Sequence, residues 1–364
     1  MTRPVVLLLT NTPAPYRLPV FAALAEQVAL TVLYCEPQQP DRLWQVDLDT
    51  AVSQKLLTHR TVNLPGLSLT LNPGLAQQLT QIPFDVAIAG ENFSHFPAVI
   101  ALQRAARQQK RPFGLWSEAI DTAYASGHLL SNLYRRWLYG RTAGFLAYSE
   151  AAKQFLLWRG APEETIVRGY QIVPPQQLPA PSLDRASLGL SDEQVVLYVG
   201  YFNMRKGLDL LLRAFQQVAQ ANDRLVLLGD GPEKSRLQQL AAKDGRILFP
   251  GYLEGAQKSS WYAASDLFVL PTRHDPWGLV VNEAMAFGLP IITTTAAGCA
   301  ELVQENGIVV PADNLEALAR ALTDLLANPA KRATMGQQSR ERIAPYTVSA
   351  ARDAFLQLIN YLLK

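Results

Sequence analysis

Short apolar runs alternate with amphipathic segments along the whole chain. Each run is rich in Val, Leu and Ile and ends in a polar, Gly or Pro turn, after which apolar residues recur at helical spacing. Continuously apolar runs suit strands that helices cover on both faces, as in parallel sheets. The pattern predicts an α/β fold with strands at Val5–Thr10, Leu30–Tyr34, Asp85–Ala89, Phe113–Trp116, Gly144–Tyr148, Val195–Gly200, Arg224–Leu228, Arg246–Phe249, Leu267–Leu270 and Ile291–Thr294.

A proline-rich stretch separates two such α/β halves. Proline cannot donate a sheet hydrogen bond and resists helix, and strand–helix alternation restarts at Val195. We therefore place the domain boundary near Pro175–Leu183, between a domain of residues 1–175 and one of residues 176–345. Ligands of parallel sheets bind beyond the carboxyl ends of the strands, and in a two-domain chain also between the domains.

Composition narrows the class of protein. Hydrophobic residues make up 49% and charged residues 18%, which suits globular domains with sizeable cores. A net charge of +2 argues against a nucleic-acid partner. Cys35 and Cys299 lie far apart, so we expect no disulfide framework and a reducing compartment. The apolar run near the N-terminus is too short for a signal peptide core or a membrane span, and we expect a cytoplasmic protein.

The most informative stretch for chemistry is Asp266–Ala296. A strand runs into the loop Pro271–Gly278, and a helix follows the loop. The free amides of Gly278, Leu279 and Val280 would then lie at a helix N-terminus, which is an anion site that suits a phosphate.

Two carboxylates, Asp275 and Glu283, flank the start of that helix. We expect them to accept hydrogen bonds from two groups of hydroxyls on one long ligand, with a sugar near the loop and a ribose near the helix. The alternative is that Asp275 only caps the turn and Glu283 is a solvated helix residue.

With its surroundings, this stretch resembles the retaining glycosyltransferases of family 4, also described as glycosyl transferases group 1. Their hallmark is an E-x7-E motif followed by a helix and a G-x-P turn, and here the motif begins with Asp275 instead of Glu. The resemblance covers most of the second half, in VLYVGYFNMRKGLDLLLRAF, LVLLGDGPEKSRL, ILFPGYL, EAMAFGLPII and ENGIVVPADNLEALARAL. It implies the GT-B fold, in which two Rossmann-like domains with parallel sheets face each other across an interdomain cleft. It also implies that the last segment, residues 346–364, crosses back to the first domain as a helix.

The resemblance assigns Lys206 to the phosphates of a nucleotide-sugar donor. Lys206 and Arg205 precede a helix, and fixed cations there can neutralise the charge of a departing diphosphate. Relatives often have an arginine directly after the strand-ending glycine, but this chain has Tyr201. We predict that Arg205 supplies the missing cation.

Two further donor-side residues are implied. Gly229, in the turn GDGPE, and Tyr252 would line the nucleotide side of the cleft. The alternatives are a tight strand-to-helix turn for Gly229 and packing for the Tyr252 side chain.

The first domain is expected to bind the acceptor. Many relatives have glycines in the loop after the first strand, whereas here Pro13 and Pro15 remove two amide donors and leave Arg17 as the polar contributor. Its alternative role is an ion pair with a surface carboxylate.

Relatives also carry a histidine after a central strand, and here Glu118 takes that place as the candidate that orients or deprotonates the acceptor hydroxyl. Glu91 and His95 are further acceptor-side candidates, and simple loop hydrogen bonding is the alternative for all three.

Two basic stretches, Arg104–Arg111 and Leu133–Arg141, have no place in this chemistry. The second interleaves aromatic residues with arginines, as in a helix that rests on anionic lipid. A packed helix with solvated arginines is the simpler alternative.

The prediction is a retaining, metal-independent hexosyltransferase that uses a UDP- or GDP-sugar and no other cofactor. Its acceptor would be a glycan or lipid-linked hydroxyl in polysaccharide or lipid-linked glycan biosynthesis, with possible peripheral contact at the inner face of a membrane. Two other classes remain open, a catalytically degenerate sugar-nucleotide-binding protein and an NAD-dependent oxidoreductase. The second is disfavoured because GDGPE lacks the dinucleotide spacing.

Overall fold

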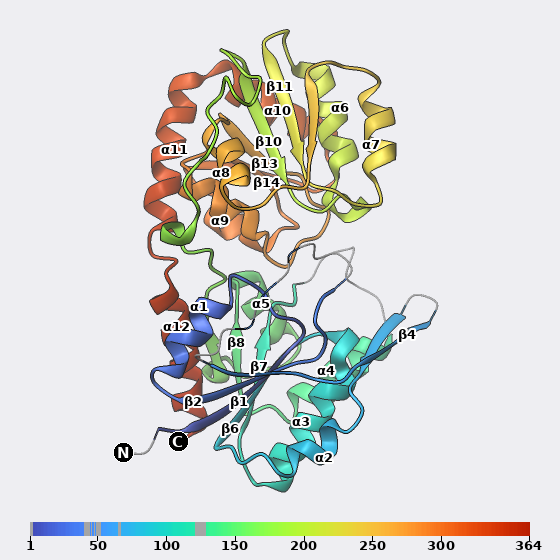
Figure 1. Cartoon of the computed structure of the whole chain (residues 1–364), viewed down its shortest axis with the longest axis vertical. Coiled ribbons are helices and arrows are strands. Elements are labelled where there is room, and N and C mark those ends of the chain that lie inside the picture. Colours follow the sequence, from blue (N-terminus) through green and yellow to red (C-terminus); the bar gives the residue numbers. More distant parts are fainter. Residues whose placement is uncertain are drawn as a thin grey trace. The chain divides into compact units, whose positions relative to one another are not determined.

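A computed structural model describes residues 3–39, 44, 46, 48, 52–64, 67–120 and 129–364. The chain divides into two compact units. The first unit comprises Met1–Gln171 and Val348–Lys364, and the second comprises Ile172–Thr347 (Figure 1).

The first unit is built on a parallel sheet with the strand order β3-β2-β1-β6-β7-β8-β9. Its strands are β1 (Val5–Thr10), β2 (Ala29–Tyr34), β3 (Ser53–Leu56), β6 (Val86–Gly90), β7 (Phe113–Ser117), β8 (Gly144–Ala147) and β9 (Ile166–Arg168). A separate antiparallel hairpin consists of β4 (Arg60–Leu64) and β5 (Leu67–Leu71). The helices are α1 (Leu18–Ala25), α2 (Leu75–Leu79), α3 (Phe96–Gln108), α4 (Leu129–Tyr139), α5 (Glu150–Trp158) and α12 (Val348–Leu362).

The second unit has a parallel sheet with the order β12-β11-β10-β13-β14-β15. Its strands are β10 (Gln194–Val199), β11 (Asp223–Leu228), β12 (Ile247–Gly251), β13 (Leu267–Leu270), β14 (Ile291–Thr294) and β15 (Gly307–Val310). Its helices are α6 (Leu208–Val218), α7 (Lys234–Ala241), α8 (Gly255–Ala263), α9 (Leu279–Ala286), α10 (Leu315–Ala327) and α11 (Pro329–Ile343).

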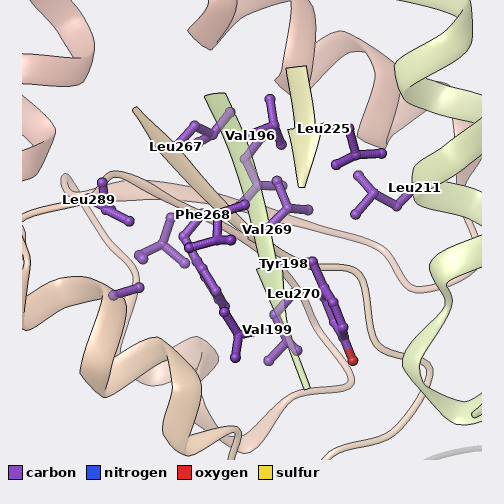
Figure 2. Close-up of a cluster of buried hydrophobic side chains, with 14 of the residues drawn as sticks. Val196, Tyr198, Val199, Leu211, Leu225, Leu267, Phe268, Val269, Leu270 and Leu289 are labelled. Carbon is purple, nitrogen blue, oxygen red and sulfur yellow. The ribbon is translucent and has the colours of Figure 1, made fainter. Parts of the chain in front are cut away.

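Helices cover both faces of the second sheet, so its central strands are apolar throughout. Figure 2 shows the side chains of β10 and β13 side by side in this core, with Val196 and Tyr198 on one strand and Leu267 and Phe268 on the other. All four side chains are fully buried. The continuous apolar runs thus predicted the central strands of both sheets to within two residues.

The strands that the apolar pattern did not predict are short, exposed or both. β3 is mostly exposed, β9 has three residues, and β4 and β5 pair only with each other. β15 lies at the edge of its sheet, and its Val309 is exposed.

The proline-rich stretch packs on the second unit, and the division between units falls four residues before the predicted one, between Gln171 and Ile172. The amides of Ser182 and Leu183 both donate to Ser260 Oγ of α8, each at 2.9 Å. These contacts hold the end of the proline-rich stretch on the second unit.

Helix α12 belongs to the first unit, although it follows the whole second unit in sequence. It lies against α1 and across β7, β8 and β9 (Figure 1). Leu358 and Leu362 cover Gly114 and Gly144, where an added Cβ would lie 2.8–3.4 Å from their methyl groups. Glycine on two neighbouring strands therefore leaves the space into which the leucines of α12 pack.

We expect Leu358→Ala to lower the free energy of unfolding of the first unit by about 2–5 kcal/mol, the usual cost of a cavity at a fully buried leucine. The control is Leu363→Ala, because Leu363 is 44% exposed on the same terminal segment. Chemical denaturation of both variants checks this. Equal stability of the two variants would contradict the packing of α12.

Candidate active site

The strand order of the second unit reverses between β10 and β13. From β10 the chain first moves outward to β11 and β12, and it then returns to the other side of β10 to form β13. The connections that follow β10 and β13 therefore lead to opposite sides of the sheet, and parallel sheets bind ligands at such switch points beyond the strand ends. Arg205 and Lys206 lie in the first loop, and Asp275 lies in the second.

The two loops meet through an ion pair. Lys206 Nζ lies 2.5 Å from Asp275 Oδ2, and the two side chains are only 12% and 11% exposed. The second carboxylate oxygen of Asp275 accepts a hydrogen bond from the amide of Trp277 at 3.2 Å. Two residues that the sequence analysis placed on one ligand thus lie together.

Electrostatics keep this site charged. Burial alone would raise the pKa of Asp275, but the charges of Lys206 and Arg205 outweigh burial and hold that pKa below its usual range. Burial and the charge of Arg205 lower the pKa of the neighbouring His274 to about 4. The imidazole is therefore neutral near pH 7, whereas Asp275 is ionised.

The start of α9 lies beside the ion pair. Gly278 has φ +95°, and a Cβ added there would lie 2.7 Å from Leu270 Cδ2 and 3.6 Å from Asp275 Oδ2. Within the described residues the amides of Gly278, Leu279 and Val280 have no hydrogen-bond acceptor. Free amides and a buried cation together form a site that fits an anionic group.

Glu283 lies one turn further along α9. Its two carboxylate oxygens accept hydrogen bonds from Lys258 Nζ and from the hydroxyl of Tyr262, both at 2.8 Å. The residue is 8% exposed, so it is not the solvated helix residue of the alternative interpretation. Sequence spacing did not reveal Lys258 and Tyr262, because they lie on α8.

Tyr252 is 39% exposed, and its hydroxyl donates to Glu254. Burial, this hydrogen bond and the charge of Glu283 raise the pKa of Tyr252. The Tyr252 side chain is thus partly exposed to solvent and does not belong to the core.

Gly229 brings three strand ends together. Its amide donates to the carbonyl of Gly251 at 2.8 Å, and an added Cβ would lie 1.9 Å from the carbonyl oxygen of Gly200. Gly229 therefore does form a tight turn. This turn packs the residues that follow β11 against those that end β12 and follow β10.

The first unit has its own pocket at the corresponding switch point, between β1 and β6. Arg17, Glu91 and Glu118 line it together with Trp116. Arg17 donates to Thr10 Oγ1 at 3.0 Å and Asn11 Oδ1 at 2.9 Å, and its guanidinium lies 4.6 Å from the Trp116 ring centre. Its carboxylate partner, at 3.8 Å, is Glu118, which is itself a predicted site residue.

The candidates Glu91, His95 and Glu118 of this unit differ in their exposure and in their hydrogen-bond partners. Glu118 is one-third exposed. The Glu91 side chain is 2% exposed and accepts hydrogen bonds from Ser117 at 2.5 Å, Arg135 at 2.7 Å and Tyr139 at 2.9 Å. This network fixes the Glu91 carboxylate in the pocket wall, against the fully buried Ser117.

His95 is not among the residues that line the pocket in the described part of the unit. It is buried, and its Nε2 lies 3.0 Å from Glu36. The structure thus brings Arg17, Glu91 and Glu118 together and leaves His95 apart.

Residues 193–328 match a family model described as glycosyl transferases group 1. The chain carries a glycosyl transferases group 1 domain. Among relatives with matching sequence is the lipopolysaccharide core biosynthesis glycosyltransferase LpsE of Rhizobium meliloti, 32% identical over 49% of this chain and 53% of LpsE. Another is a GDP-mannose-dependent phosphatidylinositol monomannoside mannosyltransferase of Corynebacterium glutamicum, 33% identical over 44% of this chain and 46% of the relative. The chain spans about half the length of such curated relatives.

Solved structures extend the likeness to both units. HepE of Anabaena in complex with UDP superposes with a TM-score of 0.78 at 19% identity, covering 99% of this chain and all of HepE. Sucrose-phosphate synthase of Thermosynechococcus elongatus gives 0.74 at 20% identity, with 98% and 99% covered. At these identities the likeness shows the fold, which is the GT-B fold of glycosyltransferases, as predicted.

Arg273 is a residue of the group 1 domain that sequence reasoning did not find. Its guanidinium donates to the Met204 carbonyl at 2.7 Å, to Asp209 at 2.8 and 3.1 Å, and to Asp313 at 2.6 Å. Its amide also donates to the Arg205 carbonyl at 2.8 Å. One side chain thus fixes the loop that carries Lys206 to the loop that carries Asp275.

Across the described part of the chain, no group of three or more His, Cys, Asp and Glu side chains is arranged to hold a metal ion.

We expect Arg273→Ala to lower the free energy of unfolding of the group 1 domain by about 3 kcal/mol, because it leaves the largely buried Asp209 without its cation. The control is Arg320→Ala, whose ion pair with Glu316 is 72% and 86% exposed and contributes under about 0.5 kcal/mol. Urea unfolding measures both. A loss no larger than the control's would mean that Arg273 does not fasten the two loops.

Proposed function

We propose that this protein is a retaining glycosyltransferase that moves a hexose from a nucleoside diphosphate sugar to an acceptor hydroxyl. The observation that supports it best is the buried pair Lys206–Asp275 beside the unpaired amides of α9, at the switch point of the group 1 domain. A cation and amides would bind the diphosphate, and a carboxylate would bind the sugar that leaves it.

Lys206 is the residue that stabilises the leaving group. Its ammonium is a compact positive charge that suits phosphate oxygens, and its contact with Asp275 places that charge in the site. Because the ion pair fixes Nζ before the donor binds, little reorganisation is needed as negative charge develops on the diphosphate. Arg205 adds a second positive charge, which already acts on Asp275.

Glu283 is proposed to hold the ribose of the donor. A carboxylate offers about four acceptor positions, and Lys258 and Tyr262 occupy two of them. The remaining positions can accept from a pair of vicinal hydroxyls. Gly229 and Tyr252 complete the nucleotide side in this proposal.

The pocket of the first unit is proposed to bind the acceptor. Glu118 is exposed enough to receive a hydroxyl proton or orient the hydroxyl, and Arg17 holds Glu118 through their ion pair. Glu91 is proposed to shape the wall of the pocket, because its own oxygens are occupied by Ser117, Arg135 and Tyr139. A glycan or lipid-linked acceptor handled in the cytoplasm fits these polar groups.

A degenerate protein that binds a sugar nucleotide without transfer is the second candidate. Tyr201 favours it, because relatives often place an arginine there and a tyrosine carries no positive charge for a diphosphate. Arg205 argues against it, because this arginine, four residues after Tyr201, supplies a positive charge that acts on Asp275.

The experiment that tests the function combines the full chain with UDP- and GDP-hexoses and a set of glycan and lipid-linked acceptors, with and without EDTA. Release of nucleoside diphosphate and formation of a glycosylated product would support transfer, and NMR of the new anomeric carbon reports retention. Donor binding with neither release nor product across the set would favour the degenerate protein, and inversion would refute the proposed stereochemistry.

We expect Lys206→Ala to reduce turnover at least about tenfold while the protein still folds, on the scale of losing one preorganised charge contact. Lys331→Ala removes a lysine of a comparable pair, 2.6 Å from Asp324 but half exposed, and is the control. Turnover of Lys206→Ala within twofold of the control would refute the role of Lys206.

We expect Glu283→Gln to weaken nucleoside diphosphate binding about tenfold or more, because hydrogen bonds to a charged group contribute roughly 1.5–3 kcal/mol. Calorimetric titration measures this affinity, and the melting temperature without ligand shows whether the fold tolerates the loss of the ion pair with the partly buried Lys258. Glu316→Gln, on an exposed helix face, is the control. Unchanged affinity would remove Glu283 from the site.

A further inference from the structure

The two basic stretches of the sequence meet on one side of the first unit. Helices α3 and α4 connect β6 to β7 and β7 to β8, which are neighbours in the sheet, and both helices pack into the same apolar cluster. Figure 1 shows the two helices on the same side of the sheet. Their solvent-facing residues, with the turns that follow, form what we call the α3–α4 face.

The charge of this face has one sign. Its exposed cations are Arg104, Arg107, Lys110, Arg111, Arg136 and Arg141. The sequence has no Asp or Glu between Glu91 and Glu118, nor between Asp121 and Glu150. Arg135 is not part of the face, because it pairs with the buried Glu91. The cations therefore accumulate without internal neutralisation, although the whole chain carries only +2.

The outer side of α4 combines these cations with apolar side chains. Leu133 is 55% exposed, and Arg136, Trp137 and Arg141 follow it at helical intervals of three, four and eight residues. Trp137 is partly buried, because one part of its side chain packs against the apolar cluster of the unit. The Arg141 guanidinium lies 4.9 Å from the centre of the Trp137 ring. Arginine beside tryptophan and leucine on one helix face is the composition of helices that lie at a lipid–water interface.

Three of the arginines line a single surface groove at the amino ends of β7 and β8. These are Arg107 and Arg111 from the first basic stretch and Arg141 from the second. Their existing partners are weak or local, since the half-exposed Arg111 lies 3.5 Å from Asp85, which is 35% exposed, and Arg141 donates to the carbonyl of Trp137. Guanidinium groups that converge in this way present paired donors to phosphate oxygens.

We propose that the α3–α4 face docks the protein on an anionic lipid surface, with Arg107, Arg111 and Arg141 on lipid phosphates and Leu133 and Trp137 at the interface. The apolar residues among the cations favour a bilayer over a nucleic acid duplex, whose phosphate backbone is bound mainly through charge and hydrogen bonds. No helix in the described part of the chain has the length and apolar character of a bilayer span, so this contact is peripheral. The groove lies at the opposite sheet edge from the acceptor pocket, so docking leaves that pocket uncovered.

Sedimentation of the full chain with vesicles tests the proposal independently of glycosyl transfer. We expect binding to vesicles of equal parts phosphatidylglycerol and phosphatidylcholine, weakening with added salt, and little binding to pure phosphatidylcholine. The triple variant Arg107→Gln, Arg111→Gln and Arg141→Gln should bind the anionic vesicles about a hundredfold more weakly, at about a fivefold loss per cation near the surface. Circular dichroism and melting curves confirm that the variant folds.

The matched control carries the same change at Arg213, Lys243 and Arg320, three exposed cations of the second unit. Equal loss of vesicle binding in control and groove variant would overturn the proposal, because net charge and not this face would then account for binding. Failure of the unmodified protein to bind anionic vesicles would overturn it as well, and so would stronger binding to duplex DNA than to the vesicles. Blue-shifted fluorescence that is lost in Trp137→Phe would support the assigned depth of α4.

Discussion

The reversal of strand order between β10 and β13 is the constraint on which the candidate site depends. Because parallel strands all present their carboxyl ends at one edge, chemistry from distant parts of the sequence gathers there. At the reversal, the loops leave in opposite directions and expose the strand ends. Lys206 and Asp275, 69 residues apart in sequence, face each other at that point. The first unit repeats the arrangement between β1 and β6, where Arg17 and Glu118 meet.

The strand ends would not by themselves hold side chains to a fraction of an ångström. Close backbone contacts do this in the second unit, where Gly207 lets the loop of Lys206 approach the Pro271 carbonyl so closely that an added Cβ would lie 2.1 Å from its oxygen. Arg273 then ties the same two loops through Met204, Asp209 and Asp313. A rigid edge suits an ion pair that must stay in place as charge moves through the site.

How much of this the sequence could predict depends on the range of the interactions. The apolar runs predicted the central strands, because burial on both faces leaves a local signature, and the Gly278–Val280 turn marked the start of α9 for the same reason. The partners of Arg273 lie 64 and 40 residues away, and Lys258 lies 25 residues before Glu283, so no local pattern could join them. Glu91 was a candidate because it comes just after a predicted strand. Only the fold shows that Arg135 and Tyr139 occupy its oxygens.

The placement of α12 has a consequence for how the chain is made. Its leucines complete the first sheet over Gly114 and Gly144, yet the ribosome delivers them only after every residue of the second unit. The second unit is contiguous in sequence and can fold as soon as it has been synthesised. The first unit is synthesised earlier, but β7 and β8 lack the packing of α12 until the end of the chain is made. Biogenesis thus runs against the order of the sequence, and the half that starts first is the half that finishes last.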